Sequence, residues 1–341
     1  MSVPVLAPGD RVPNLTFPDL EGKTRLLYLE VFGGPILVAV APDPEDAESR
    51  AILSGLAKRA SSLDAIKAHR FVLTRKRPSD RVDPKALVML DPYGDAMKMF
   101  RPILNGSDAD DARSKASVAV LDANQRLVSL ITTETARDPV GTALDVARGV
   151  AAAAARDPLR LDRAAPAMIL DKLLSDTLCA TLVERWEADH QEGTVSDGFK
   201  NVTDLTIKRN QEHVIRDPEL QRVVVQQIGP RVVNEIQKVF NYRHPLRFEM
   251  LTVLSYDASR QDFFGPHRDN LRSEQRRRFA LSLNLNDGYE GGELVFPEYG
   301  PHRFAPPKGA GAVFSCELLH QALPVTKGRR FVLTTFMIEP T

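Results

Sequence analysis

Residues 256–270 read Tyr-Asp-Ala-Ser-Arg-Gln-Asp-Phe-Phe-Gly-Pro-His-Arg-Asp-Asn and place a histidine and a carboxylate two positions apart, at His267 and Asp269. On a β-strand, side chains at positions i and i+2 point to the same face of the sheet. Both side chains can then reach one metal ion. The stretch therefore predicts a strand that presents part of a metal site.

Two later positions complete the predicted site. His320 supplies a third ligand, and Arg330 begins the apolar strand segment Arg-Phe-Val-Leu-Thr-Thr-Phe-Met. Two histidines and one carboxylate form the facial triad that binds non-haem Fe(II) and leaves other coordination positions open. A buried arginine offers a planar fork that holds a carboxylate through two hydrogen bonds. Together these residues predict an iron site with a docking point for an acidic co-substrate.

The chain around this segment has the pattern of a β-rich domain. Short apolar runs separated by Gly and Pro turns predict strands at 248–256, 279–286, 291–296, 311–316 and 330–338. Close spacing of short strands favours a double-sheet jelly roll. Apolar residues at helical spacing predict helices at 170–190, with Ser175 or Asp176 as N-cap, and at 217–240, opened by Asp217-Pro218. Both helices are expected to brace the sheet.

The first part of the chain has a different pattern, in which strands alternate with helices. Strands are predicted at 36–41, 70–74, 86–90, 117–122 and 127–131, and helices at 45–61 and 140–155. This alternation indicates an α/β sandwich. A Pro- and Arg-containing stretch at 158–167 is the predicted linker. We therefore expect one domain over 1–157 and a second over 168–341, in keeping with a length of 341 residues.

Composition excludes several classes of function. Lys plus Arg and Asp plus Glu are both 45, so the formal net charge is zero, which argues against a nucleic-acid or membrane-surface role. The two cysteines, Cys179 and Cys316, lie far apart and predict a reducing, cytoplasmic location without disulfides. The N-terminus lacks the cationic start and apolar core of a signal peptide, and the apolar stretch at 150–155 is too short to cross a bilayer.

Five stretches of the second half resemble, in order, the prolyl 4-hydroxylase-type branch of the Fe(II)/2-oxoglutarate dioxygenases. They are Leu-Ser-Tyr-Asp at 254–257 and residues 264–270, 278–286, 289–297 and 319–331, within a likeness that spans 168–339. The resemblance implies a double-stranded β-helix, with His267, Asp269 and His320 as Fe(II) ligands. It also implies that Arg330 pairs with the distal carboxylate of 2-oxoglutarate, and it assigns no catalytic residue beyond the metal ligands.

Three positions near this site have two readings each. Tyr256 matches a family tyrosine that hydrogen-bonds the co-substrate, but an aromatic side chain that fills the barrel explains it almost equally well. Asn284 and Asn286 alternate on a predicted strand, so that one can face the cavity, and hydrogen bonding at the end of the sheet explains both of them too.

The first 155 residues resemble the peroxiredoxin branch of the thioredoxin fold. The matching stretches are 8–15, 20–23, 34–40 and 119–128. Peroxiredoxins carry a nucleophilic cysteine at the start of the helix that follows the matching strand. Here that stretch reads Ala-Pro-Asp-Pro-Glu-Asp-Ala-Glu-Ser at 41–49, and no cysteine precedes Cys179. Peroxide reduction is thereby excluded, and the domain is expected to be a scaffold or interaction domain.

The combined reading is a dioxygenase that hydroxylates a C–H bond and decarboxylates 2-oxoglutarate to succinate and CO2. Fe(II), 2-oxoglutarate and dioxygen are the expected cofactors, with ascorbate as an optional addition. A prolyl or other residue of a peptide or protein is the leading substrate class. The alternatives are a hydroxylase of a free amino acid or small metabolite, and a non-catalytic sensor of iron and 2-oxoglutarate. A cupin of different chemistry shares the barrel, but it usually offers HxH and has no need of Arg330. The oligomeric state stays open, with a homodimer among the options.

Overall fold

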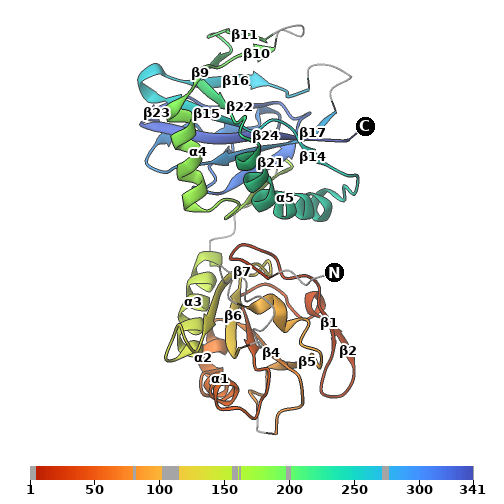
Figure 1. The fold of residues 1–341 in the computed structure, drawn as a ribbon. Coiled ribbons are helices and arrows are strands. Elements are labelled where there is room, and N and C mark those ends of the chain that lie inside the picture. Colours follow the sequence, from red (N-terminus) through yellow and green to blue (C-terminus); the bar gives the residue numbers. More distant parts are fainter. Residues whose placement is uncertain are drawn as a thin grey trace. The chain divides into compact units, whose positions relative to one another are not determined.

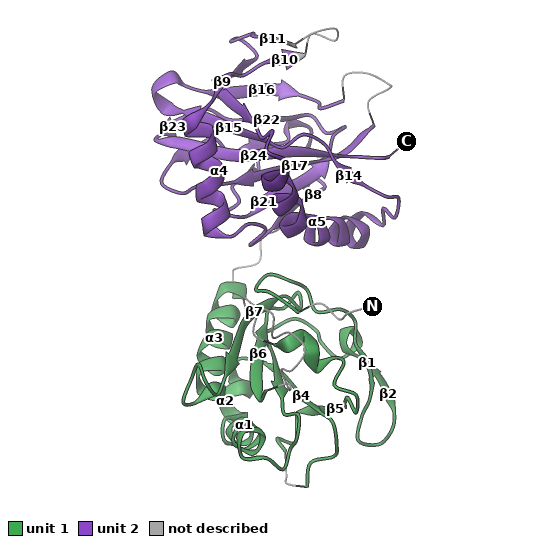
Figure 2. Ribbon diagram, viewed as in Figure 1, with its two compact units in different colours: residues 1–159 green, residues 160–341 purple. Residues whose placement is uncertain are grey.

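The computed structural model describes residues 5–79, 82–101, 115–155, 160, 163–196, 201–270 and 276–340. The chain forms two compact units, Met1–Leu159 and Arg160–Thr341, and the division lies inside the stretch predicted as a linker (Figure 2). Both units are mixed α/β structures with several sheets. Within the described ranges, no helix combines the length and the apolar character needed to span a membrane.

Unit 1 is built on a five-stranded sheet in the order β5-β4-β3-β6-β7 (Figure 1). The strands are β3 (Ile36–Val40), β4 (His69–Thr74), β5 (Leu87–Leu90), β6 (Ser117–Leu121) and β7 (Leu127–Thr132), and a hairpin of β1 (Thr16–Pro18) and β2 (Thr24–Leu26) lies outside this sheet. The pairs β3–β4 and β4–β5 are parallel, and β3–β6 and β6–β7 are antiparallel. The described residues of the unit also form the short 3-10 helices η1 (Leu27–Leu29) and η2 (Met97–Phe100) and three α-helices.

The central strand β3 is buried on both faces, which explains its unbroken apolar sequence. Leu37 and Ala39 pack into one core with residues of α1 (Ala47–Lys58) and α3 (Pro139–Ala154), whereas Ile36, Val38 and Val40 pack into the core of the opposite face. Aspartates cap both helices, as the side chain of Asp46 accepts from Ser49 N and that of Asp138 accepts from Gly141 N. The single helix predicted at 45–61 is wrong, because the chain leaves helical geometry at Arg59 and restarts as α2 (Ala60–Ala65).

Unit 2 contains two larger sheets. The eight-stranded sheet has the order β8-β21-β17-β24-β15-β13-β9, with β14 paired to β24, and the five-stranded sheet has the order β12-β16-β22-β19-β20. The first consists of β8 (Ala167–Leu170), β9 (Gln191–Glu192), β13 (Gln211–Val214), β14 (Arg247–Phe248), β15 (Thr252–Asp257), β17 (Arg277–Asn284), β21 (Gly311–Ser315) and β24 (Arg329–Ile338). The second consists of β12 (Lys208–Arg209), β16 (Phe263–His267), β19 (Leu294–Val295), β20 (Arg303–Phe304) and β22 (His320–Ala322). Smaller pairs are β10 (Val195–Ser196) with β11 (Asn201–Val202) and β18 (Glu290–Gly291) with β23 (Val325–Lys327), and the 3-10 helices are η3 (Ala258–Arg260) and η4 (Pro297–Tyr299).

Helices α4 (Asp176–Ala188) and α5 (Pro218–Phe240) cover one face of the eight-stranded sheet (Figure 1). Ser175, one of the two predicted N-caps, caps α4, and Asp217 followed by Pro218 opens α5, as predicted. The helix predicted at 170–190 starts too early, because Leu170 ends β8 and α4 begins at Asp176. Strand alternation divides β24 between two environments. Phe331 and Leu333 pack with the helices, whereas Val332 packs on the other face, with Tyr256. The same alternation directs Arg330 away from the helices.

Two predicted strands are interrupted. The strand expected at 248–256 is divided into β14 and β15, with residues 249–251 between them. The strand expected at 291–296 is broken at Gly292, whose φ of +72° cannot continue a strand. Strands of two to five residues, such as β12, β16 and β22, are too short to show a period in the sequence.

Candidate metal centre

The two histidines of the predicted site meet across neighbouring strands. His267 is the last residue of β16, His320 is the first residue of β22, and the two are direct cross-strand partners. Asp269 lies beyond the end of β16, so the expectation that His267 and Asp269 share one strand face is wrong. The Asp269 backbone N–H instead donates to the carbonyl of Cys316 at 3.1 Å, which brings the carboxylate back to the histidines.

The three side chains converge on one point. One ligand atom from each of His267, Asp269 and His320 lies within 4.8 Å of the others. The Nε2 atoms of His267 and His320 each lie 3.7 Å from a carboxylate oxygen of Asp269. Two imidazoles and one carboxylate on one side of a point match the donor set of a facial Fe(II) site.

Hydrogen bonds within each ligand segment orient the imidazoles. His267 Nδ1 lies 2.8 Å from the carbonyl oxygen of Gly265, and His320 Nδ1 lies 2.9 Å from that of Leu318. With Nδ1 donating to a carbonyl, the Nε2 lone pair is left for a metal. Among the described residues, Asp269 Oδ2 has no hydrogen-bond donor although it is buried. A buried oxygen without a donor fits a metal ligand, so these residues suit Fe(II).

The electrostatics of the site agree with this fit. Burial lowers the pKa of His267 to about 3, and the nearby His320 contributes in the same direction. Burial also raises the pKa of the Asp269 carboxyl above its usual range. The imidazole therefore stays neutral and able to coordinate at neutral pH, whereas the charged carboxylate is costly without a cation. A bound dication removes that cost.

Aromatic side chains surround the two histidines. The Phe264 ring stacks on His267 at 3.6 Å between centroids and 13° between planes, and Phe314 meets His320 edge-on at 4.7 Å. The ammonium of Lys208 lies 5.2 Å over the Phe264 ring and forms a buried ion pair with Glu212 at 3.0 Å. Sequence reasoning missed Lys208, since no motif connects it with the ligands, and it assigned no role to Phe264, although Phe264 begins the matching stretch 264–270.

A second contact set joins the segments that carry the ligands. Arg268 forms a fork to Glu298, with Nη2–Oε1 at 2.7 Å and Nη1–Oε2 at 3.2 Å. Glu298 also accepts from the backbone N–H of Leu319 at 3.3 Å. Because Arg268 lies between two ligands and Leu319 precedes the third, Glu298 bridges both ligand segments.

Arg330 lies in the interior, with 3% of its surface exposed, whereas Arg329 points outward. The Nε and Nη2 atoms of Arg330 donate to Asn284 Oδ1 at 3.0 and 2.7 Å. Of the two asparagines left open by the sequence, Asn284 is thus the interior one. Asn286 accepts from Phe331 N at 2.8 Å at the end of the sheet.

Tyr256 is the direct cross-strand partner of Arg330. The Arg330 guanidinium carbon lies 5.9 Å from the centre of the tyrosine ring, and burial raises the pKa of the phenol. The structure thus brings Tyr256 and Arg330 together on the buried face of β15 and β24. Their roles toward a co-substrate stay predictions.

Residues 251–338 match the model of the 2OG-Fe(II) oxygenase superfamily. This part of the chain is a 2OG-Fe(II) oxygenase domain. That family uses Fe(II), 2-oxoglutarate and dioxygen, so the predicted cofactors and the prediction of a 2-oxoglutarate-dependent dioxygenase are confirmed for this domain. The matched segment contains all three predicted metal ligands, together with Arg330 and Tyr256.

Two curated relatives are procollagen-lysine,2-oxoglutarate 5-dioxygenase 1 of Rattus norvegicus, 26% identical, and of Bos taurus, 28% identical, each over 178 residues. Each match covers 48% of this chain and 23% of the relative, so the chain spans about a quarter of the relatives' length.

Three solved structures match about half of the chain or less. The viral collagen prolyl hydroxylase of Paramecium Bursaria Chlorella virus-1 is 19% identical with a TM-score of 0.39, covering 51% of this chain and 96% of that one. A Pseudomonas putida prolyl-4-hydroxylase is 21% identical with a TM-score of 0.41, covering 52% and 94%. Peroxidoxin BcpB of Mycobacterium tuberculosis is 19% identical with a TM-score of 0.35, covering 42% and 98%.

Proposed function

We propose that the chain is a hydroxylase that inserts one oxygen atom into a C–H bond of its substrate. With Fe(II) bound, the centre activates dioxygen while 2-oxoglutarate is decarboxylated to succinate and CO2, which supplies two electrons for the hydroxylation. The observation that carries this proposal is the convergence of His267, Asp269 and His320 on one point in a domain that also buries Arg330.

In this proposal the residues of the chain bind, orient and exclude water. His267, Asp269 and His320 would hold the iron, and a set of three ligands would leave coordination positions for the co-substrates. Arg330 holds the distal carboxylate of 2-oxoglutarate, because a planar guanidinium can donate two parallel hydrogen bonds to a carboxylate. Tyr256 is proposed to hydrogen-bond the same co-substrate. Aromatic rings beside the histidines keep water from the centre.

The arrangement of the sheets in each unit supports a proposal for its fold. We interpret the two larger sheets of unit 2 as a double-stranded β-helix (jelly roll) braced by α4 and α5. Unit 1 is interpreted as a thioredoxin-like domain of the peroxiredoxin branch, supported by its mixed sheet, in which β3 pairs in parallel with β4 and antiparallel with β6. Without a cysteine before Cys179, this domain is proposed to serve as a scaffold or docking domain.

A residue of a peptide or protein is the proposed substrate class. The curated relatives are named for procollagen lysine, and one similar structure is a Trichoplax adhaerens prolyl hydroxylase in complex with a peptide fragment of hypoxia inducible factor. A free amino acid or small metabolite is the second candidate. Mass spectrometry of peptides and of extract metabolites incubated with the enzyme distinguishes them by which class gains one oxygen atom.

The test of the reaction class is succinate release by the full chain with Fe(II), 2-oxoglutarate and dioxygen. His267→Ala, Asp269→Ala and His320→Ala are expected to abolish succinate formation and to lose bound Fe(II), measured by metal analysis. The exposed His302 gives the matched control, because His302→Ala removes an imidazole outside the centre. Succinate formation that persists in all three ligand variants contradicts the proposal. A non-catalytic sensor is indicated instead if the wild type binds Fe(II) and 2-oxoglutarate but forms no succinate with any substrate.

A further inference from the structure

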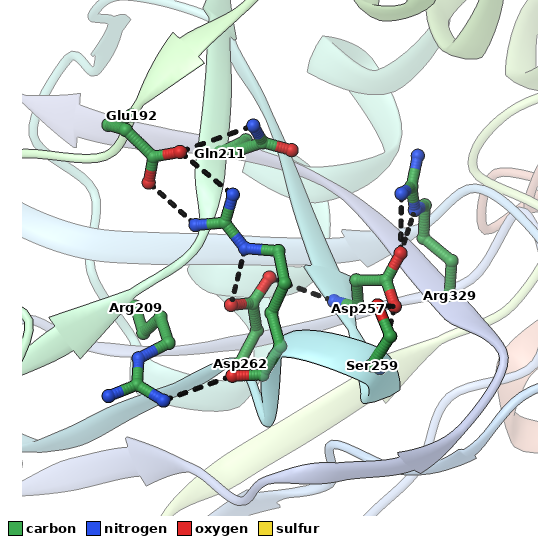
Figure 3. Close-up of polar contacts among 8 residues, drawn as sticks. Glu192, Arg209, Gln211, Asp257, Ser259, Asp262 and Arg329 are labelled. Atoms are coloured by element: carbon green, nitrogen blue, oxygen red, sulfur yellow. Dashed lines mark hydrogen bonds and ion pairs between the residues drawn. The ribbon is translucent and has the colours of Figure 1, made fainter.

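Asp257 and Arg329, which directly follow Tyr256 and directly precede Arg330 in paired strands, belong to a network of charged side chains. Figure 3 shows this network, with Asp257, Arg329, Asp262 and Glu192 among its members. We infer that Asp257, Arg329 and Asp262 are positioning residues for the co-substrate anchor Arg330. The inference rests on the proposed function, since it assumes that Arg330 binds 2-oxoglutarate. It adds a group of residues that hold the anchor from outside the site.

The network begins directly next to the anchor. Tyr256 pairs with Arg330 across β15 and β24, and Asp257 pairs with Arg329 at the next position. Arg329 Nε donates to Asp257 Oδ2 at 2.8 Å, and its Nη2 contacts the same oxygen. Alternation along both strands directs this ion pair outward and the Tyr256–Arg330 pair inward. The outer pair therefore fastens together the two strand ends that carry the inner pair.

The network continues from Asp257 to the buried carboxylate of Asp262. Figure 3 shows Asp257 with Arg329 on one side and Asp262 on the other. The backbone N–H of Asp257 donates to Asp262 Oδ2 at 2.9 Å, and the Asp262 N–H donates to the Asp257 carbonyl at 3.1 Å. Only 1% of Asp262 is exposed. These reciprocal bonds close the η3 turn into a rigid connection between β15 and β16.

Arg260 anchors that turn to a neighbouring strand. Its Nε lies 3.2 Å from Asp262 Oδ1, and its two Nη atoms donate to the Glu192 carboxylate of β9 at 2.8 and 2.6 Å. Arg209 of β12 donates to the Arg260 carbonyl at 3.0 Å. The turn is thus held from several strands, and it runs directly into β16.

The turn between β15 and β16 links the strand pair that carries Arg330 to the strand that carries the metal ligand His267. Arg330 lies on β24, and His267 lies at the far end of β16, so the turn between β15 and β16 lies on the path from the anchor to a metal ligand. A co-substrate that chelates the metal at one end and pairs with Arg330 at the other requires both groups to be held at a set separation. An ion pair with one partly exposed partner, such as Asp257–Arg329, is expected to contribute only modestly to the free energy of unfolding. Its expected effect is therefore on co-substrate affinity.

The experiment measures binding of Mn(II) alone, and then of 2-oxoglutarate in the presence of Mn(II), by isothermal titration calorimetry on the full chain. Mn(II) replaces Fe(II) to prevent turnover. Asp257→Asn and Arg329→Gln are expected to raise the Kd for 2-oxoglutarate about tenfold and to leave the Kd for Mn(II) within about twofold. Arg329→Lys keeps the charge but loses the fork, so its effect is expected to lie between those of the wild type and Arg329→Gln.

The matched control is Lys327→Gln, which removes an exposed ion pair with Glu290 two positions before Arg329 and is expected to change neither Kd. Far-UV circular dichroism checks that each variant is folded. Trp186 emission does not serve for this check, because the Arg329 guanidinium carbon lies 5.2 Å from its ring and replacing Arg329 changes the emission directly.

Two outcomes overturn the inference alone. One is a wild-type Kd for 2-oxoglutarate in all three network variants, and the other is a rise in the Mn(II) Kd that parallels the rise for 2-oxoglutarate, which indicates general loosening. A wild-type chain that binds Mn(II) but no 2-oxoglutarate overturns the proposed function and the inference together.

Discussion

Gly292 provides a sharp test of how Arg330 is held. Its φ of +72° lies in the left-handed region, and a Cβ added there would lie 3.0 Å from Arg330 Cδ and 2.8 Å from Val325 Cγ2. Both distances are shorter than ordinary van der Waals contact, so the two side chains would have to move by several tenths of an ångström. The chain therefore needs glycine at this position for two separate reasons, backbone conformation and space beside the anchor.

Gly292→Ala is expected to lower the free energy of unfolding by about 1–2 kcal/mol, because a left-handed alanine is strained. It is also expected to raise the Kd for 2-oxoglutarate at least tenfold, since a misplacement of about 1 Å at a binding group can cost roughly 100-fold. Urea denaturation measures the first effect. Calorimetric titration of 2-oxoglutarate into the Mn(II)-loaded chain measures the second.

Gly288→Ala is the matched control. Gly288 also has a positive φ, +84°, but no described atom lies within 4 Å of its added Cβ. The control is expected to lose a similar free energy of unfolding and to keep the wild-type affinity for 2-oxoglutarate. Equal affinities in the two variants would refute the reasoning, because they would show that the contact with Arg330 does not control co-substrate binding.

Three further predictions concern other parts of unit 2. Asn284→Leu removes the acceptor of two hydrogen bonds from a buried guanidinium, so it is expected to lower the free energy of unfolding by about 1.5–3 kcal/mol; an unchanged urea midpoint would contradict this role. Hydrogen bonding, first from Arg278, lowers the pKa of Glu339 to about 2 from 4.5. Between pH 4.5 and pH 2, Glu339 is therefore protonated in the unfolded chain but still ionised in the folded chain. The stabilisation that ionised Glu339 gives the folded chain is fully present above pH 4.5 and is lost as the pH falls toward 2. Glu339→Gln should then show a smaller difference in urea midpoint between pH 7 and pH 3 than the wild type, and an identical difference would argue against the assigned pKa. Burial raises the pKa of Cys179 to about 11 and also raises that of Cys316, so iodoacetamide at pH 8 is expected to label both only after unfolding; rapid labelling of the native chain, followed by mass spectrometry, would disprove it.

Part of the site was accessible from the sequence because its chemistry is unusual. A histidine and a carboxylate two positions apart, with a further histidine and an arginine in an apolar strand, match few sites other than a facial iron centre. The prediction that one strand presents both His267 and Asp269 was only partly right. His267 lies on a strand as predicted, but Asp269 lies beyond its end and is brought in by a backbone hydrogen bond to Cys316.

Residues that support the site carry no such signal. The sequence indicated that either Asn284 or Asn286 faces the cavity. Only the hydrogen bonds from Arg330 to Asn284 show that it is Asn284. Lys208 approaches Phe264, the residue that stacks on His267, through pairing of β12 with β16, two short strands far apart in sequence. Pairing of this kind depends on which strands become neighbours in the folded chain.

The sequence by itself determined the kinds of atoms available for the metal and the anchor, the start of α5, and the buried character of β3. These features depend on side-chain chemistry and on local periodicity, which a linear chain already contains. Tertiary structure alone decided that His267 faces His320, that Asn284 rather than Asn286 meets Arg330, and that Gly292 leaves room beside that arginine. The physical reason is that each of these contacts joins segments whose approach is set by sheet order and register, and both are properties of the whole domain.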